Sequence, residues 1–211
     1  MKKLLVYLLS SFLISSCSLL GIQSEESPIY KVLIKDGDFE IREYESYIVA
    51  KTTVKGTYKE NSGKAFRILA GYIFGKNRSD QDIAMTSPVK VQTKAEKIPM
   101  TSPLKAQENL NSEEFQMTFT MPKKYTLGTL PKPLDNRVSF EKIPRKIIAS
   151  HRFTGFSSQK KKQKVAKELK EWLAKQEDYS ISSDYSFAGY NPPWTIPFLK
   201  RNEIHFELSK N

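Results

Sequence analysis

Alternating hydrophobic and polar positions divide the first part of the chain into short strands. Three stretches alternate in this way: 30–34, 39–44 and 47–54. Asp36-Gly37, between the first two stretches, is typical of a tight hairpin turn. The spacing then changes, because one face of a predicted helix carries Ala65, Phe66, Leu69, Tyr72 and Ile73. The pattern therefore predicts three strands followed by one amphipathic helix.

The same order of elements returns about one hundred residues later. Residues 138–153 are again rich in β-forming side chains, and a second predicted helix carries Val165, Ala166, Leu169, Trp172 and Leu173, each one hundred positions after its counterpart. Two more strands are predicted after each helix, at 83–91 and 115–121, then at 185–190 and 203–208. We therefore predict one α+β domain over 29–211, made of pseudo-repeats at 29–125 and 136–211, whose two helix-covered sheets close into a barrel or cleft.

A shorter repeat lies inside the first half. Residues 83–90, with the sequence IAMTSPVK, recur as IPMTSPLK at 98–105. Each copy is predicted to be a short strand that ends at its Ser-Pro step, because proline removes a ladder donor. A duplicated edge strand without chemistry is the simpler interpretation of this repeat.

The N-terminus has the features of an export signal. Lys2 and Lys3 precede an apolar run over 4–14, which is shorter than the roughly 20 residues that span a bilayer. Cys17, the only cysteine, follows Ile14-Ser15-Ser16 and looks like the lipidated cysteine of a bacterial lipobox. We therefore predict a signal peptide over 1–16, lipidation at Cys17 and a tether over 17–28. A plain signal peptide with a chance cysteine, or an uncleaved anchor, remains the alternative.

Composition narrows the possible partners and chemistry. The 211 residues are 39% hydrophobic, enough for a globular core, and carry a formal net charge of +11, which favours anionic partners. Nucleic acid fits poorly, since no recognition motif is present and the chain is predicted to be exported. Two histidines, His151 and His205, are too few for an ordinary zinc site, and no hydrolase motif occurs. We therefore predict that the protein is not an enzyme.

A proline-stiffened aromatic loop precedes the last predicted strand. It contains Asn191-Pro192-Pro193-Trp194 and Thr195-Ile196-Pro197-Phe198, and it leads to Lys200-Arg201. One interpretation is a rigid apolar lid with a cationic rim, suited to a flat ligand that carries carboxylates. The other is a crossover whose aromatic side chains fill the core.

Several of these segments together resemble the SOUL haem-binding family over nearly all of 29–209. The matching segments are FEIREY at 39–44, YIFGKN at 72–77, IAMTSPV at 83–89, MTFTMP at 117–122, NPPW at 191–194 and RNE at 201–203. The resemblance implies a twisted antiparallel β-barrel flanked by two helices with internal pseudo-symmetry, similar to the effector-binding domains of bacterial regulators. It also implies a module that binds haem or a related porphyrin without established catalysis.

The resemblance places the ligand in a cleft between the first helix and the loop before the last strand. There it implies a binding set of Phe66, Arg67, Ala70, Trp194, Phe198 and Arg201, with the two arginines available for propionates. Some family members have a histidine, proposed as an iron ligand, where this chain has Glu43. His151 is the weak remaining candidate, so haem is expected to bind weakly or without coordination of its iron.

These observations combine into a functional hypothesis. The chain is predicted to be a lipid-anchored, non-catalytic module of the bacterial cell envelope, on the periplasmic face or the cell surface. Its predicted partners are a small-molecule tetrapyrrole or similar flat amphipathic anion, and the membrane through the lipid on Cys17. The alternative is a structural or protein-interaction lipoprotein of the envelope that holds no small ligand.

Overall fold

A computed structural model describes residues 25–56, 58–94, 114–191 and 195–211. The predicted signal peptide, Cys17, most of the tether, the second IPMTSPLK copy at 98–105 and Trp194 lie outside these residues. The described part of the chain forms ten strands, two α-helices and one 3-10 turn: β1 (Tyr30–Asp36), β2 (Phe39–Tyr44), β3 (Tyr47–Lys55), α2 (Tyr58–Ile73), β4 (Val89–Lys94), β5 (Glu114–Thr120), β6 (Ser139–Ile143), β7 (Lys146–Phe153), α3 (Gln159–Leu173), β8 (Tyr179–Ile181), β9 (Ser186–Gly189), η1 (Pro197–Leu199) and β10 (Asn202–Lys210).

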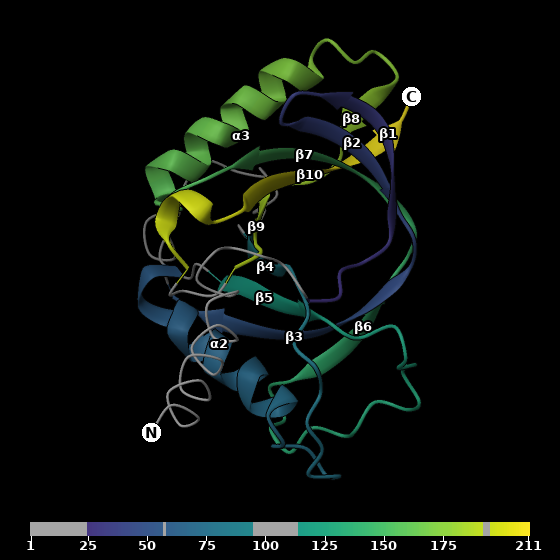
Figure 1. The fold of residues 1–211 in the computed structure, drawn as a ribbon, viewed down its shortest axis with the longest axis vertical. Helices are drawn as coiled ribbons and strands as arrows, with labels where there is room; N and C mark the ends of the chain where they lie inside the picture. Colours follow the sequence, from purple (N-terminus) through teal and green to yellow (C-terminus); the bar gives the residue numbers. More distant parts are fainter. Residues whose placement is uncertain (1–24, 57, 95–113, 192–194) are drawn as a thin grey trace, which may run out of the picture.

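The strands form one antiparallel sheet that curls around itself (Figure 1). Its order is β1-β2-β7-β10-β9-β4-β5-β3-β6, and β8 pairs with the outer part of β10. Helix α2 packs on β3 and β5, whereas α3 packs on β7 and β10, both on the outside of the curl. The predicted α+β fold, a curled antiparallel sheet flanked by two helices, is therefore confirmed.

Two separate apolar cores lie between the helices and the sheet. The first joins α2 to β3, β4 and β5, and the second joins α3 to β2, β7, β9 and β10. The helix positions predicted from the 3.6-residue spacing supply both cores, since Leu69 and Leu169 are fully buried. Ser158 caps α3, where its side chain accepts a hydrogen bond from the Lys161 main-chain N–H at 3.2 Å.

The opposite face of the sheet lines the inside of the curl and is polar. Because side chains alternate along a strand, the neighbours of the core residues point inward. On β10, Ile204 and Phe206 face α3, whereas Glu203 and His205 face inward. The buried inward set also includes Arg42, Tyr44, Ser150 and Tyr190.

Two details of the sheet differ from the sequence prediction. Residues 83–88 are not a strand, because β4 begins at Val89, directly after Pro88, whose nitrogen carries no hydrogen for a ladder. Thr86 instead donates its hydroxyl to the Thr120 carbonyl. The strands also cross between the predicted repeats, since β2 pairs with β7 and β6 pairs with β3. The origin of the chain by duplication stays a prediction.

Candidate functional site

A buried carboxylate occupies the centre of the inward face. Glu203 on β10 is fully buried and accepts hydrogen bonds from five side chains. We call Glu203 and its five donors the Glu203 cluster: Arg42, Ser150, Tyr190, Arg201, Glu203 and His205. Arg42 donates through both terminal nitrogens, at 2.7 and 3.2 Å. Arg201 donates through Nε at 2.9 Å and Nη2 at 2.6 Å, and its guanidinium lies 4.1 Å from the centre of the Tyr190 ring.

The hydrogen bonds keep this carboxylate ionised. Burial alone would raise the pKa of Glu203, but hydrogen bonds from His205 and Arg42 outweigh burial and hold the pKa well below its ordinary range. Burial and the nearby carboxylate raise the pKa of Tyr190 well above its usual value, so this hydroxyl keeps its proton and donates it. Burial lowers the pKa of His205 to about 4, which leaves that ring neutral at pH 7. The cluster is therefore an ion-pair network in which both oxygens of the Glu203 carboxylate accept hydrogen bonds.

The geometry of the cluster differs from that of a hydrolytic triad. In a triad the histidine lies between the nucleophile and the carboxylate. Here the carboxylate lies in the middle, because Ser150 Oγ at 3.1 Å and His205 Nε2 at 2.7 Å both bind Glu203 Oε2. Ser150 is fully buried as well. This arrangement fixes strands β2, β7 and β10 to one another and leaves Ser150 without a histidine base.

A large cavity, which we call the Tyr125 cavity, lies elsewhere. It has a volume of about 590 Å³ and is bounded by four chain segments: 26–29, 45–48, 120–128 and Lys142. Apolar groups supply much of its wall, including Ile48 and Met121, which also border the first core. Its volume lies within the roughly 300–1,000 Å³ of small-molecule sites.

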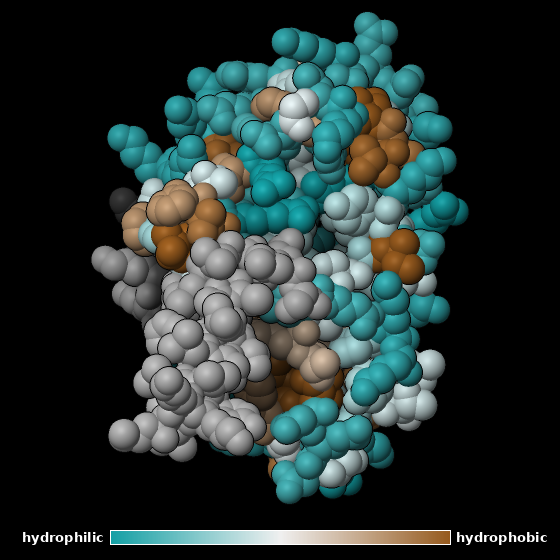
Figure 2. All heavy atoms as spheres, viewed as in Figure 1, coloured by the Kyte–Doolittle hydropathy of each residue, from teal (hydrophilic) through white to brown (hydrophobic). Residues whose placement is uncertain are grey.

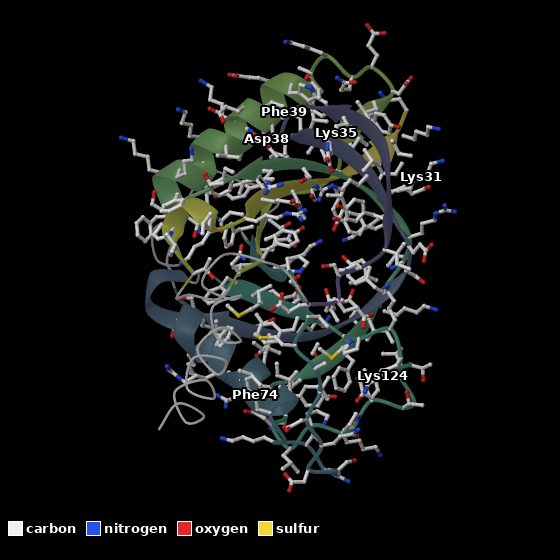
Figure 3. All side chains as sticks on the ribbon, viewed as in Figure 1. Lys31, Lys35, Asp38, Phe39, Phe74 and Lys124 are labelled. Atoms are coloured by element: carbon white, nitrogen blue, oxygen red, sulfur yellow. The ribbon has the colours of Figure 1, made fainter. Side chains whose placement is uncertain are left out.

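One residue that lines this cavity carries a buried polar atom without a partner. Tyr125 Oη is shielded from solvent and forms no hydrogen bond with the described residues. Lys123 and Lys142 are exposed at the rim, and Lys124 Nζ lies 5.0 Å from the centre of the Tyr125 ring (Figure 3). Glu26, also in the wall, accepts the Lys123 main-chain N–H at 2.7 Å. An apolar hollow with cationic groups outside and one unpaired hydroxyl suits an amphipathic anion.

The residues that the resemblance implied as a binding set are spread over different environments. Phe66 packs edge-on against Phe119 in the first core, 5.4 Å between ring centres, and Ala70 is buried in the same core. Arg67 is exposed in a shallow depression. Phe198 is 70% exposed. Arg201 binds Glu203, and Trp194 lies outside the described residues.

The two histidines face opposite sides of the sheet. His151 faces α3 and stacks on Phe39 at 4.0 Å between ring centres, and Phe39 in turn stacks on Trp172 at 5.2 Å. Burial lowers the pKa of His151. The described residues contain no group of three or more side chains that could hold a metal ion. No helix among them is long and apolar enough to cross a membrane.

Both the Glu203 cluster and the Tyr125 cavity were missed from the sequence. No sequence signal marked the cluster, because Arg42 and Glu203 stand among other charged residues of β2 and β10, where alternation predicts an ordinary polar face. The cavity had no signal either, because four segments distant in the sequence form its wall.

Comparison with known protein families identifies the chain. The model of the family described as SOUL heme-binding protein matches residues 25–207. The chain belongs to this family. Heme-binding protein 1 of Xenopus laevis is 28% identical over 189 residues, covering 88% of this chain and 92% of that protein. Human Heme-binding protein 2 is 28% identical over 177 residues, covering 83% of this chain and 80% of its own length.

Solved structures share the fold at low sequence identity. The EcmrR C-terminal domain superposes with a TM-score of 0.59 at 11% identity, covering 87% of this SOUL chain and 99% of that domain. A structure described as a hydrolase from Listeria innocua gives a TM-score of 0.57 at 12% identity, over 84% of this chain and 94% of its own. At such identities the likeness concerns the curled sheet and its two helices alone.

Proposed function

We propose that this SOUL protein binds haem or a related tetrapyrrole, without transforming it, in the Tyr125 cavity. Membership of the family over 25–207 is the observation that carries the proposal, and relatives named for heme binding support it. The cavity offers a matching environment. Its apolar wall would contact the ring, and the exposed ammonium groups of Lys123 and Lys142 would pair with propionates at the rim.

The unpaired Tyr125 hydroxyl fits the same ligand. Tyrosine is one of the side chains that ligate haem iron in proteins, and a buried hydroxyl without a partner is unfavourable until a ligand satisfies it. Haem would supply the iron, whereas the chain supplies the apolar wall, the rim charges and this oxygen. Absence of catalysis is part of the proposal, and it is supported by the carboxylate-centred arrangement around Ser150.

A haemin titration of the full-length protein tests this proposal. Binding should shift the Soret absorbance and quench tryptophan fluorescence with one haemin per chain at micromolar concentration. Tyr125→Phe should alter the bound spectrum and weaken binding at least tenfold. Tyr179→Phe is the matched control, because it removes the same atom from a tyrosine packed at the other core.

A further variant separates the function from its location. Phe198→Ser changes an exposed ring of the cleft that the family resemblance implied. If Phe198→Ser weakens haemin binding and Tyr125→Phe does not, the ligand lies in that cleft, and the assignment to the Tyr125 cavity is wrong. If the wild-type protein gives no spectral change, tetrapyrrole binding itself is wrong.

We also propose that the protein works from the bacterial cell envelope, tethered by a lipid on Cys17. The support is the placement of the single cysteine after Ile14-Ser15-Ser16 and an apolar run. More than one acyl chain is needed for firm anchoring. Labelled palmitate should enter the wild-type protein and not Cys17→Ser, and the wild-type protein should sediment with membranes. An unlabelled wild-type protein would contradict the anchor.

A further inference from the structure

A second, polar cavity lies inside the curl of the sheet, and we call it the concave cavity. Its volume is about 300 Å³, and its wall combines inward-facing residues from both halves of the sheet. Lys90 and Gln92 come from β4, Thr118 from β5, and His205 from β10. The Tyr47 ring borders this cavity and the larger Tyr125 cavity alike. The concave cavity is too small and too polar for a macrocycle.

The carboxylates of the concave cavity are already paired. Glu141 forms an ion pair with Lys51, and Glu207 forms one with Lys146. Lys90 differs, because its ammonium has no carboxylate within 4.0 Å among the residues that the structure describes. The Lys90 ammonium is therefore a cation of the wall that Glu203 and Glu207 stabilise only at longer range, without an ion-pair contact.

The contacts of Lys90 leave most of its donors unused. Its Nζ donates to Tyr47 Oη at the long distance of 3.4 Å and lies 5.5 Å from the centre of the Tyr44 ring. Burial lowers the pKa of Lys90 to about 8, so the amine is still mostly charged at pH 7. An ammonium carries three donors, and an anion in the cavity would satisfy the remaining ones.

His205, which lines the same cavity, carries an unpaired acceptor. Its ring is 1% exposed, and its Nε2 lies 2.7 Å from Glu203 Oε2. Since Glu203 is ionised, Nε2 must carry the hydrogen, and Nδ1 of the neutral ring is then a bare lone pair. This Nδ1 is buried and has no hydrogen-bond partner among the described residues. A ligand that presents a hydroxyl hydrogen would satisfy it.

We propose that the concave cavity binds a small hydroxy acid, with its carboxylate on the Lys90 ammonium and its hydroxyl donated to His205 Nδ1. Gln92, Gln116 and Thr118 offer further amide and hydroxyl groups to the same ligand. The inference does not rest on tetrapyrrole binding, because the two cavities share only the Tyr47 ring among their wall residues. The proposed hydroxy acid would bind the inward face of the sheet independently of the tetrapyrrole.

Isothermal titration calorimetry at pH 7 with paired acids tests the proposal on the full-length protein. L-Malate and succinate differ by one hydroxyl, as do citrate and tricarballylate. We expect each hydroxy acid to bind at least tenfold more tightly than its partner. Lys90→Gln should weaken binding of L-malate at least tenfold, whereas Lys35→Gln, which changes an exposed lysine on β1, should leave it unchanged.

Three results would overturn the inference. If L-malate and citrate both fail to bind at millimolar concentration, the proposed site does not exist. If the two acids of a pair bind with equal affinity, His205 Nδ1 does not recognise the hydroxyl. If Lys90→Gln binds L-malate as tightly as the wild-type protein does, the acid binds elsewhere on this basic protein. Haemin titrations run beside these measurements keep the two proposals separate, since loss of haemin binding alone would leave the concave cavity unaffected.

Discussion

Replacing Glu203 by glutamine should strongly destabilise the fold. The substitution keeps the shape of the side chain but removes the charge that compensates Arg42, whose side chain is only 3% exposed. Arg42 would keep a single ion pair, at 2.7 Å to Glu40, and the hydrogens from Ser150 and Tyr190 would meet a weaker acceptor. Breaking one side of a buried pair costs about 3–5 kcal/mol. We expect the free energy of unfolding to fall by that amount.

Urea unfolding of the full-length protein in a mild detergent, followed by tryptophan fluorescence, measures this loss. Glu141→Gln is the control, since it removes a carboxylate from a partly exposed pair and should cost less than about 1 kcal/mol. The double variant Arg42→Met/Glu203→Leu removes both charges and should recover most of the loss. A decrease below about 1 kcal/mol in Glu203→Gln would refute the view that this carboxylate holds the inward face together.

Three further predictions concern acid and the helices. Because burial lowers the folded-state pKa of His205 and His151, the unfolded chain binds more protons than the folded chain below about pH 6.5. Unfolding free energy should therefore fall with decreasing pH by up to about 1.4 kcal/mol per pH unit for each ring, and His205→Gln should reduce that slope in urea titrations. Ser158→Ala removes the α3 cap and should cost about 1 kcal/mol, seen as a lower melting temperature by circular dichroism. Leu169→Ala should cost about 2–5 kcal/mol, whereas Leu127→Ala, at a half-exposed position, should change stability by less than about 0.5 kcal/mol in the same assay.

The sequence was most informative where one periodicity dominated. The 3.6-residue spacing placed Leu69 and Leu169 on the buried faces of their helices, and strand alternation placed His205 opposite Ile204 and Phe206. Both inferences hold because each concerns a single element. Alternation alone does not say whether the polar side of a strand meets solvent or the inside of a curl, so Glu203 gave no sign of burial.

Sites shared by distant segments could not be predicted. The Tyr125 cavity depends on how the segment at 26–29 lies across the ends of β3 and β5, which no local pattern encodes. The strand expected at 83–88 failed for a local reason, since Pro88 cannot donate to a neighbouring strand. Figure 2 shows a largely hydrophilic surface with separate hydrophobic patches on one face, and these patches alone do not single out a site.

The central claim is that a tetrapyrrole occupies the Tyr125 cavity. Amide hydrogen exchange of the full-length protein, read by mass spectrometry with and without haemin, tests the location directly. The account predicts slower exchange in peptides covering 45–48 and 120–128, and no change in peptides from α3. Protection confined to α2 and residues 195–201, or no protection anywhere while haemin is bound, would contradict it.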